Sequence, residues 1–273
     1  MANTNTFREI GICFGISKAS AWRIVERTSA WLISIGHQFI KWPNTSEAFA
    51  NMAKVEATKK FPFVIGCIDS THIKINAPHH SKEAYFNRKH YYSLILQAVC
   101  DANGLFIDVC VGEPGSLHDS RVLRRSQLYS TASLPSKFPN GSFILGDSAY
   151  PNLNWLVSPF KDNGALSSAQ RQFNVMHLQA RIVIEDAFGR MKTRFRRLLH
   201  FMEQQRTPAI TNLIMCACIL HNICCSQNDE IDNEFTQNVY SSEEDIINTQ
   251  NFEVDNRWSS VLQYLIETGV ITS

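Results

Sequence analysis

The chain has 273 residues, 44% of them hydrophobic, and a formal net charge of +1 at pH 7. That length and apolar content suffice for one large packed domain or two small ones. No run reaches the roughly 18 apolar residues of a membrane helix, and the first residues, MANTNTFRE, lack the apolar core of a signal peptide. We therefore expect a soluble globular protein that has no membrane association and stays inside the cell.

The small net charge hides a strong asymmetry along the chain. Residues 226–256 hold nine acidic residues and no Lys or Arg, whereas residues 1–225 hold 25 basic and 15 acidic residues, a net charge of +10. A basic body of this kind suits a polyanionic partner, and the alternative is an ordinary solvated surface followed by a disordered tail. The Asn, Gln, Ser and acid content of residues 226–256 predicts a flexible segment.

The eight cysteines form no pattern typical of a secreted disulfide framework. Three lie in strand-like runs and four in one apolar helix, so we interpret them as reduced core thiols (Cys67, Cys100 and Cys110; Cys216, Cys218, Cys224 and Cys225). Cys218, His221 and Cys225 share one face of that helix, which is a weak zinc signal. A buried core helix is the favoured interpretation, because paired zinc knuckles are missing.

The N-terminal segment, residues 1–45, has a helix-turn-helix rhythm. A helix over Phe7–Phe14 is followed by a turn at Gly15, and Ser17 begins a second helix that runs through Trp31. The second helix offers Lys18, Ser20, Arg23 and Arg27 to phosphates or base edges. Any two-helix corner could give this pattern, and a DNA-binding unit would need a third helix, expected before Phe7.

Two apolar runs each lead to an aspartate. Phe61–Ile75 carries Asp69 and continues as a strand beyond it, and Phe143–Pro151 is a short strand that carries Asp147. Burying a carboxylate beside a central strand is costly unless a cation or a hydrogen-bond network compensates it. A helix packed on the same sheet, Arg181–His200, would supply Glu185 as a third acid. This set predicts a shared metal site. Because Asp186 follows Glu185 directly, the pattern alone does not decide which of the two faces the sheet.

The intervening and C-terminal segments complete the expected fold. Ser93–Asp101 and Leu105–Gly112 are predicted strands of a hairpin, and a helix begins at His118-Asp119-Ser120. Asp119 could cap that helix or bind metal, and the sequence favours neither. A buried helix follows Pro208, and Trp258–Ile271 is expected to form a last amphipathic helix.

The order of strand, hairpin, strand and helices is that of a ribonuclease H-like domain, an α/β fold in which a mixed sheet is flanked by helices. The motifs GCIDSTHIKI, YFNRKHYYSLILQAVCD, PGSLHDSRVLRRS, LGDSAYP, HLQARIVIEDAFGRMKTRFRRL and LHNI resemble the PIF/Harbinger transposase-derived nucleases of the DDE superfamily. The resemblance covers residues 7–225. It implies a nuclease domain over residues 61–225, preceded by the helical segment 1–45 and followed by the acidic segment 226–256 and a helix over 257–273.

The resemblance also implies the site residues and the chemistry. Asp69, Asp119, Asp147 and Glu185 match the family's metal-binding carboxylates, and Asp69, Asp147 and Glu185 would be catalytic. Two Mg²⁺ or Mn²⁺ ions held by oxygen ligands suit phosphodiester cleavage. The implied function is a metal-dependent DNA endonuclease. A catalytically silent DNA- or chromatin-associated protein and an intact transposase are the alternatives.

Basic residues are candidates for guiding DNA to these acids, although those of the long helix could equally form a solvated face (Arg88, Lys89, Arg181, Arg190, Lys192, Arg194, Arg196 and Arg197). Nearby histidines, including His118 and His177, are interpreted as structural. The resemblance implies DNA as the substrate, a Myb-like DNA-binding protein as a partner, and the nucleus as the location, with the cytoplasm as an alternative. The oligomeric state does not follow from the sequence.

Overall fold

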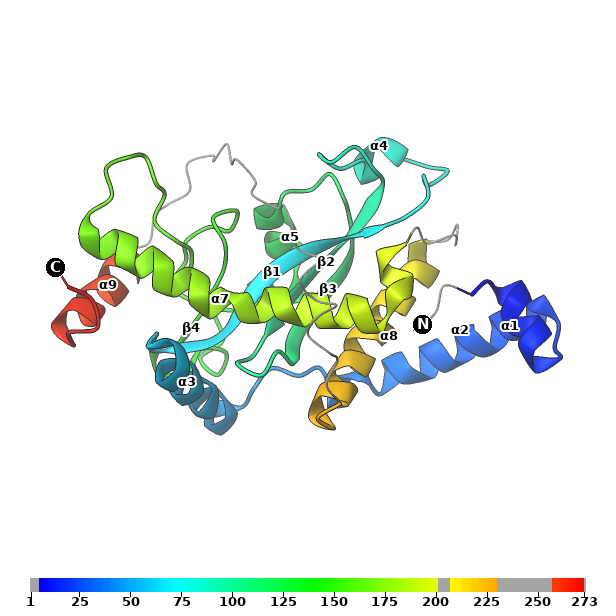
Figure 1. Cartoon of the computed structure of the whole chain (residues 1–273), viewed down its shortest axis with the longest axis horizontal. Coiled ribbons are helices and arrows are strands. Elements are labelled where there is room, and N and C mark those ends of the chain that lie inside the picture. Colours follow the sequence, from blue (N-terminus) through cyan, green and yellow to red (C-terminus); the bar gives the residue numbers. More distant parts are fainter. Residues whose placement is uncertain (1–4, 201–206, 230–256, 273) are drawn as a thin grey trace.

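A five-stranded mixed sheet forms the centre of the computed structural model, which describes residues 5–200, 207–229 and 257–272 (Figure 1). The strand order is β3-β2-β1-β4-β5. The long strand β1 (Val64–Lys74) pairs antiparallel with β2 (Ser93–Cys100), which pairs antiparallel with β3 (Phe106–Pro114). On its other side β1 pairs in parallel with β4 (Phe143–Leu145), and β4 with β5 (Leu156–Val157). This mixed sheet confirms the predicted ribonuclease H-like α/β class.

The strands β1 to β4 lie close to their predicted positions, whereas β5 was not predicted. β1 begins at Val64 rather than Phe61, because Phe63 adopts a left-handed conformation with φ of 62° and delays the start of pairing. The hairpin turn between β2 and β3 contains Gly104 at φ of 76°, a conformation that favours glycine. Asp101 Oδ1 closes this turn by accepting hydrogen bonds from the backbone N–H groups of Asn103 and Leu105.

Helices cover both faces of the sheet. One face packs on α7 (Ser168–Arg194) and α8 (Thr207–Ser226), and α9 (Arg257–Glu267) packs against α7. Figure 1 shows α7 lying across the sheet. The opposite face buries side chains of α3 (Thr45–Lys59), α5 (Asp119–Arg125) and α6 (Gln127–Thr131), whereas the short α4 (Lys82–Tyr85) contributes no buried residue. Single-turn 3-10 helices follow α2, precede β4 and follow α7 (Gly36–Gln38, Pro139–Gly141 and Arg196–Leu199).

The long helix α7 begins earlier and ends sooner than the sequence pattern indicated. It starts at Ser168, where Ser167 and Gln170 form a reciprocal capping box, and it ends at Arg194 because Phe195 leaves helical geometry. The expected range Arg181–His200 therefore identified the middle of the helix but missed its first 13 residues. A Ser three residues before a Gln was the available signal for its start.

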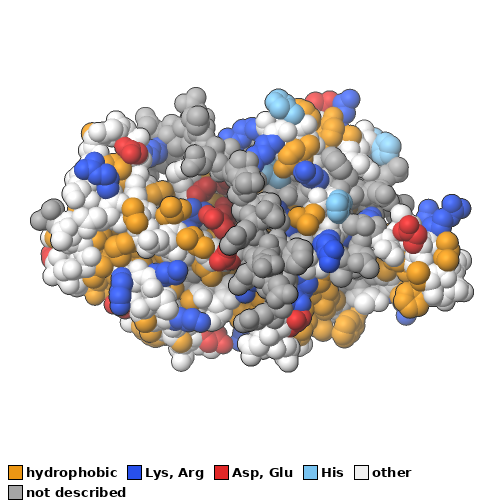
Figure 2. Space-filling view, in the orientation of Figure 1, with side chains coloured by type: hydrophobic (Ala, Val, Ile, Leu, Met, Phe, Trp, Pro, Cys, Tyr) orange, Lys and Arg blue, Asp and Glu red, His pale blue; other side chains and the backbone are white. Residues whose placement is uncertain are grey.

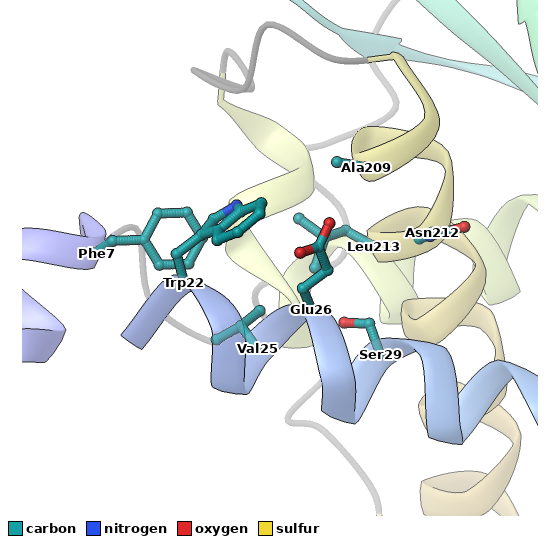
Figure 3. A pocket seen from close by; sticks show the side chains of 8 residues that line it. All are labelled: Phe7, Trp22, Val25, Glu26, Ser29, Ala209, Asn212 and Leu213. Atoms are coloured by element: carbon teal, nitrogen blue, oxygen red, sulfur yellow. The ribbon is translucent and has the colours of Figure 1, made fainter. Parts of the chain in front are cut away.

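The N-terminal helices form the predicted pair. Thr6 caps α1 (Phe7–Phe14), and Ser17 caps α2 (Lys18–Ser34), with Gly15 between them at φ of 63°. The pair extends to one end of the molecule (Figure 1). Trp22 and Ser29 of α2 line a shallow groove against Leu213 of α8 (Figure 3).

The DNA-binding role of this pair stays a prediction, as does the division of the chain into domains. Lys18, Arg23 and Arg27 are exposed on α2, as a phosphate-contacting surface would require. The interpretation of residues 226–256 as flexible falls mostly outside the described residues.

The two C-terminal helices begin close to their predicted positions. α8 is long and apolar enough to cross a membrane by length and composition alone, and half of its most apolar window is buried inside the protein. It packs on β3, α2 and α7, as a core helix does. α9 begins at Arg257, one residue before the predicted start, and ends at Glu267 rather than Ile271.

The LHNI motif on α8 has a structural role. The buried Asn222 accepts a hydrogen bond from Phe106 N at 2.8 Å and donates to Phe106 O at 2.7 Å and to Phe39 O at 2.8 Å. Its neighbour His221 bonds through Nε2 to Gly104 O at 2.9 Å. The motif therefore holds the start of β3 and the β2–β3 turn against α8.

We expect Asn222→Ala to lower the free energy of unfolding by about 3 kcal/mol, because it removes the partner of two buried backbone groups and of one partly buried group. Urea denaturation followed by circular dichroism measures the change. Asn212→Ala is the matched control, since Asn212 is exposed on the same helix and its loss should change stability by less than about 0.5 kcal/mol. Equal effects of the two substitutions would contradict the role given to Asn222.

Candidate active site

The site forms where β4 leaves the edge of β1. The last parallel pair joins Cys67 to Leu145, and both side chains belong to the core between the sheet and α7. Two residues further along each chain stand Asp69 and Asp147, so the two acids lie at the same level. β1 itself continues to Lys74, and Asp69 pairs with Ala98 of β2. Asp69 is thus inside the strand rather than at its exit, and the departure of β4 makes room for its carboxylate.

Asp147 sits in a tight turn that begins with Gly146. A Cβ at Gly146 would come within 3.0–3.1 Å of Leu156, Ile68 and Tyr150 side-chain atoms, so glycine allows this close approach to β1. Asp147 Oδ1 accepts a hydrogen bond from Ala149 N at 3.0 Å. Asp147 therefore caps its own turn. This role uses one carboxylate oxygen and is compatible with a second role for the other.

Asp119 reaches the same region from α5. The helix cap is His118, whose Nδ1 accepts from Ser120 N at 3.3 Å, so Asp119 occupies the first helical position instead of capping. The negative charge of Asp119 raises the pKa of Asp69 and of Tyr150. The capping interpretation of Asp119 was wrong, and its charge acts on the acidic group. We expected His118 to be structural, and as the cap residue it is.

Glu185 comes from the middle of α7, one turn after Arg181. Glu185 Oε1 lies 3.9 Å from Arg181 Nη2, and the same Nη2 lies 3.2 Å from Asp69 Oδ2. Asp186 is exposed, so the helix register presents Glu185 to the site. Arg181 was expected to guide DNA. Its side chain is only 8% exposed and is bound to an acid of the site, so that expectation was wrong.

Burial dominates the electrostatics of Asp69. It raises the pKa of this carboxyl to about 8, although Arg181 and the backbone N–H of Ser70, 2.7 Å from Oδ1, favour the charged form. Asp147 and Asp119 raise the same pKa further by repulsion. Desolvation lowers the pKa of Arg181, but Asp69, Asp147 and Glu185 more than offset this and raise it. These mutual effects place the four carboxylates and one guanidinium in a single electrostatic group.

A hydroxyl network that the sequence did not indicate lies beside this group. The Tyr150 hydroxyl is 2.8 Å from Ser70 Oγ and donates to Gln97 Oε1 at 3.3 Å. Burial, with the charges of Asp119, Asp69 and Asp147, raises the pKa of Tyr150 well above its usual value, so the phenol stays protonated. Tyr150 follows Asp147 by three residues in the LGDSAYP motif. This proximity to a predicted site acid was the only sequence signal for the hydroxyl network.

The donor chemistry suits a hard divalent cation, since every acid offers carboxylate oxygens. In the part of the chain that the structure describes, however, no three His, Cys, Asp or Glu side chains already stand in coordinating geometry. Asp69 and Glu185 instead share Arg181. The acids are gathered but not closed around a common point, and the metal assignment of Asp69, Asp119, Asp147 and Glu185 stays a prediction.

The basic residues predicted to contact DNA fall into three places. Lys192 lies on the site side of α7 and bonds to Thr71 Oγ1, two residues beyond Asp69. Arg190 donates a hydrogen bond to Asn103 O in the β2–β3 turn, and Arg194 forms a salt bridge with Asp229. Arg88 and Lys89 are exposed in a loop that the buried Asn87 organises through hydrogen bonds from Lys89 N and Tyr91 N. Figure 2 shows acidic side chains gathered over the middle of this face, with Lys and Arg on either side.

Buried histidines and cysteines have structural partners. His177 bonds to Val157 O at 3.0 Å, and burial lowers its pKa to about 3, so it stays neutral. On α8, Cys225 Sγ lies 3.5 Å from His221 Nε2, which also bonds Gly104 O, whereas Cys218 Sγ contacts Met191. The core-helix interpretation of this trio is favoured over zinc by these contacts.

Residues 68–222 match the family model described as DDE superfamily endonuclease. The chain belongs to this family. The match covers every acid of the site and the LHNI motif as far as Asn222. No solved structure matches the chain.

Relatives agree with this membership. A mouse protein named "Putative nuclease HARBI1" is 34% identical over 218 residues, covering 78% of this chain and 61% of the relative. An Arabidopsis thaliana "Protein ALP1-like" is 30% identical over 239 residues, covering 81% and 57%. A second Arabidopsis protein, "Antagonist of like heterochromatin protein 1", is 26% identical over 241 residues, covering 84% and 61%. The chain therefore spans about three fifths of the length of these relatives, and the resemblance to Harbinger-derived nucleases is confirmed.

The raised pKa of Asp69 predicts a pH dependence for this DDE domain without metal. Because the pKa of Asp69 is raised from its ordinary value of 3.8 to about 8, the folded state keeps this proton to a higher pH than the unfolded chain does. The stabilisation is therefore complete below the lower pKa and is lost as pH rises toward the higher one. We expect the melting temperature in EDTA to fall between about pH 4 and pH 8, and Asp69→Asn to flatten this profile. Parallel profiles for both proteins would contradict the shift.

Proposed function

We propose that the chain is a metal-dependent DNA endonuclease with Asp69, Asp147 and Glu185 as catalytic ligands and Asp119 as a fourth metal ligand. The observation that carries this proposal is the convergence of four acids from β1, the β4 turn, α5 and α7 on one partly desolvated place. Such a concentration of negative charge disfavours the metal-free fold and favours a bound cation. Family membership supplies the reaction class.

Two divalent cations, Mg²⁺ or Mn²⁺, would activate a water and stabilise the leaving 3′ oxygen of a phosphodiester. The chain's own residues supply the rest. Asp69 on β1 and Asp147 in the turn after β4 lie at one level and are placed to share a ligand, and Glu185 approaches them from α7. The Tyr150 hydroxyl fixes Ser70, whose backbone N–H orients the Asp69 carboxylate. Each acid is thus oriented by an element of the fold rather than by a flexible loop.

DNA is the proposed substrate, and the contacts are proposed to be mostly with phosphates. Lys192 bonds to Thr71, two residues beyond Asp69 on β1, and Arg88 and Lys89 offer a second, exposed contact. Arg190 and Arg194 would contribute at the end of α7. Lys and Arg contacts with phosphates give affinity without sequence information, so we propose that a Myb-like partner supplies target choice. The nucleus is the proposed location.

The decisive substitution is Asp147→Asn. The amide keeps the Oδ1 acceptor used by Ala149 N but is a poor ligand for a hard cation. We expect plasmid nicking with Mn²⁺ to be lost, DNA binding to be kept, and the melting temperature in EDTA to rise because one repelling charge is removed. Mn²⁺ should then stabilise the variant less than its parent.

Asp186→Asn is the matched control for this experiment. It removes one acid from the same protein at an exposed position of α7 next to Glu185. Nicking and the Mn²⁺ response should remain at the parent's level. Nicking by Asp147→Asn at the parent's rate, or a lower melting temperature of that variant in EDTA, would show that Asp147 serves only its turn.

Phosphate-dominated binding predicts a strong salt dependence. The affinity of this protein for duplex DNA of arbitrary sequence should fall steeply between 50 and 200 mM salt, by about 10² or more if several phosphates are contacted. Lys192→Gln should reduce the slope of log affinity against log salt by about one. Fluorescence anisotropy measures both quantities. An affinity that does not change with salt would contradict the electrostatic interpretation.

A catalytically silent chromatin-associated protein is the second candidate function. The observation in its favour is the relative named as an antagonist of like heterochromatin protein 1, which matches 84% of this chain. Both candidates include DNA contact, but only the nuclease needs a divalent cation. DNA binding without nicking in Mn²⁺ would favour this second candidate, and an intact transposase would additionally join DNA strands.

A further inference from the structure

Arg181 is the one Lys or Arg side chain that is fully buried among the described residues. It projects from α7 toward β1, and its Nη2 touches acids from two different elements, Asp69 at 3.2 Å and Glu185 at 3.9 Å. Asp147 and the Cys67 thiol act on it as well. A guanidinium offers five donors and does not lose its charge in proteins. It is therefore a permanent cation beneath the acids.

The surroundings of Arg181 distinguish it from an ordinary buried ion pair. A pair in the interior is usually satisfied by several good hydrogen bonds, because each unpaired donor costs free energy. Arg181 has one hydrogen bond at 3.2 Å and one contact at 3.9 Å, and its buried Nε has no partner within the described residues. The guanidinium is thus held by charge more than by geometry. Such a contact can be given up at a lower cost than a bidentate pair.

The acids show the complementary property. Asp69 uses Oδ1 for Ser70 N and Oδ2 for Arg181, so Arg181 holds the carboxylate oxygen that accepts no backbone hydrogen bond. Glu185 presents its Oε1 to the same guanidinium and is 37% exposed. No three potential ligands of the described residues stand ready for a metal. The two carboxylates that Arg181 contacts, those of Asp69 and Glu185, are therefore among the acids that do not stand in coordinating geometry.

We propose that Arg181 is the internal counter-cation of the metal-free site, and that it gives up Asp69 Oδ2 and Glu185 Oε1 when a divalent cation binds. This inference rests on the proposed metal-dependent function. Arg181 is a positioning residue in it, because it acts through the two acids. Its charge lets the chain fold with clustered carboxylates before metal arrives, and the same charge weakens metal binding. Metal occupancy and the Arg181 contact are then mutually exclusive and energetically coupled.

The first test compares wild type with Arg181→Met, which keeps the length and apolar bulk of the side chain without its charge. Mn²⁺ binding is measured by electron paramagnetic resonance of free Mn²⁺ and by calorimetry, with no DNA present. We expect Arg181→Met to melt at a lower temperature in EDTA and to bind Mn²⁺ about five-fold or more tightly, the effect of one nearby screened charge. Unchanged or weaker Mn²⁺ binding would overturn the proposal.

Arg171→Met is the matched control. Arg171 is an exposed residue of the same helix whose Nη1 donates to Leu166 O, and it lies about 15 Å along the helix axis from Arg181 at 1.5 Å per residue. Its removal lowers the net charge by the same amount. Mn²⁺ affinity should stay within two-fold of wild type. A similar increase in both variants would show a general charge effect and overturn the specific role of Arg181.

The second test uses the wild-type chain and does not depend on the folding of Arg181→Met. The side-chain N–H signals of Arg181 are assigned by nitrogen-15 NMR from the signal lost in Arg181→Lys. Saturating Mg²⁺ should shift these signals and speed their exchange with water as the Asp69 contact is released. Arg181 signals that do not change at Mg²⁺ saturation would overturn the exchange of partners.

The outcomes separate this inference from the proposed function. A wild-type protein that binds no Mn²⁺ would overturn both. A protein that binds Mn²⁺ with the expected Arg181→Met effect but never nicks DNA would support the counter-cation and overturn the nuclease. A nicking enzyme in which Arg181→Met leaves Mn²⁺ affinity unchanged would keep the nuclease and overturn the counter-cation.

Discussion

The separation of β4 from β1 after the Cys67–Leu145 pair is the constraint on which the site depends. A parallel neighbour of full length would cover the edge of β1 at Asp69 and leave no room for a ligand. Because β4 has only three residues and Gly146 turns it away, Asp147 arrives at the level of Asp69. α7 then crosses at this opening and brings Arg181 and Glu185. A break in strand pairing has thus become the place where four elements present polar groups.

Burial destabilises the charged form of Asp69, and several partners each offset part of this destabilisation. Desolvation raises the pKa of Asp69 more than its neighbours lower it, so a single ion pair with Arg181 does not compensate it fully. The Ser70 backbone N–H and the Tyr150 hydroxyl network hold the carboxylate in place. Stability without metal and the proposed binding of a metal would therefore be opposed at this site, as expected where a fold keeps charges it does not need for packing.

The sequence was sufficient for four of the five strands and most helices, because these depend on local periodicity and on motifs in a fixed order. The metal-binding role of the four acids stays a prediction. It was not sufficient for partners across elements. Arg181 looked like one more cation on an amphipathic helix, since its contact with Asp69 spans 112 residues of chain. Asp119 could be separated from a cap only when His118 was seen to accept the hydrogen bond from Ser120 N. The capping box indicated the early start of α7, but the prediction used the apolar pattern, which is clear only in the middle of the helix.

The family's motifs fall into two groups, those that stabilise the fold and those that do not. LHNI holds the β2–β3 turn through His221 and Asn222, so packing alone explains it. Packing does not explain the acids in this way, since the turn that Asp147 caps uses only its Oδ1 acceptor, which Asn would also supply. Asp69 is desolvated, Asp147 and Asp119 repel its charged form, and Asn at position 147 or 119 would relieve the metal-free fold of a charge. A chain selected only for stability would have no physical reason to gather them, whereas a chain that binds divalent cations needs this set of oxygen donors. The electrostatic cost of the site is therefore itself an argument for metal-dependent chemistry.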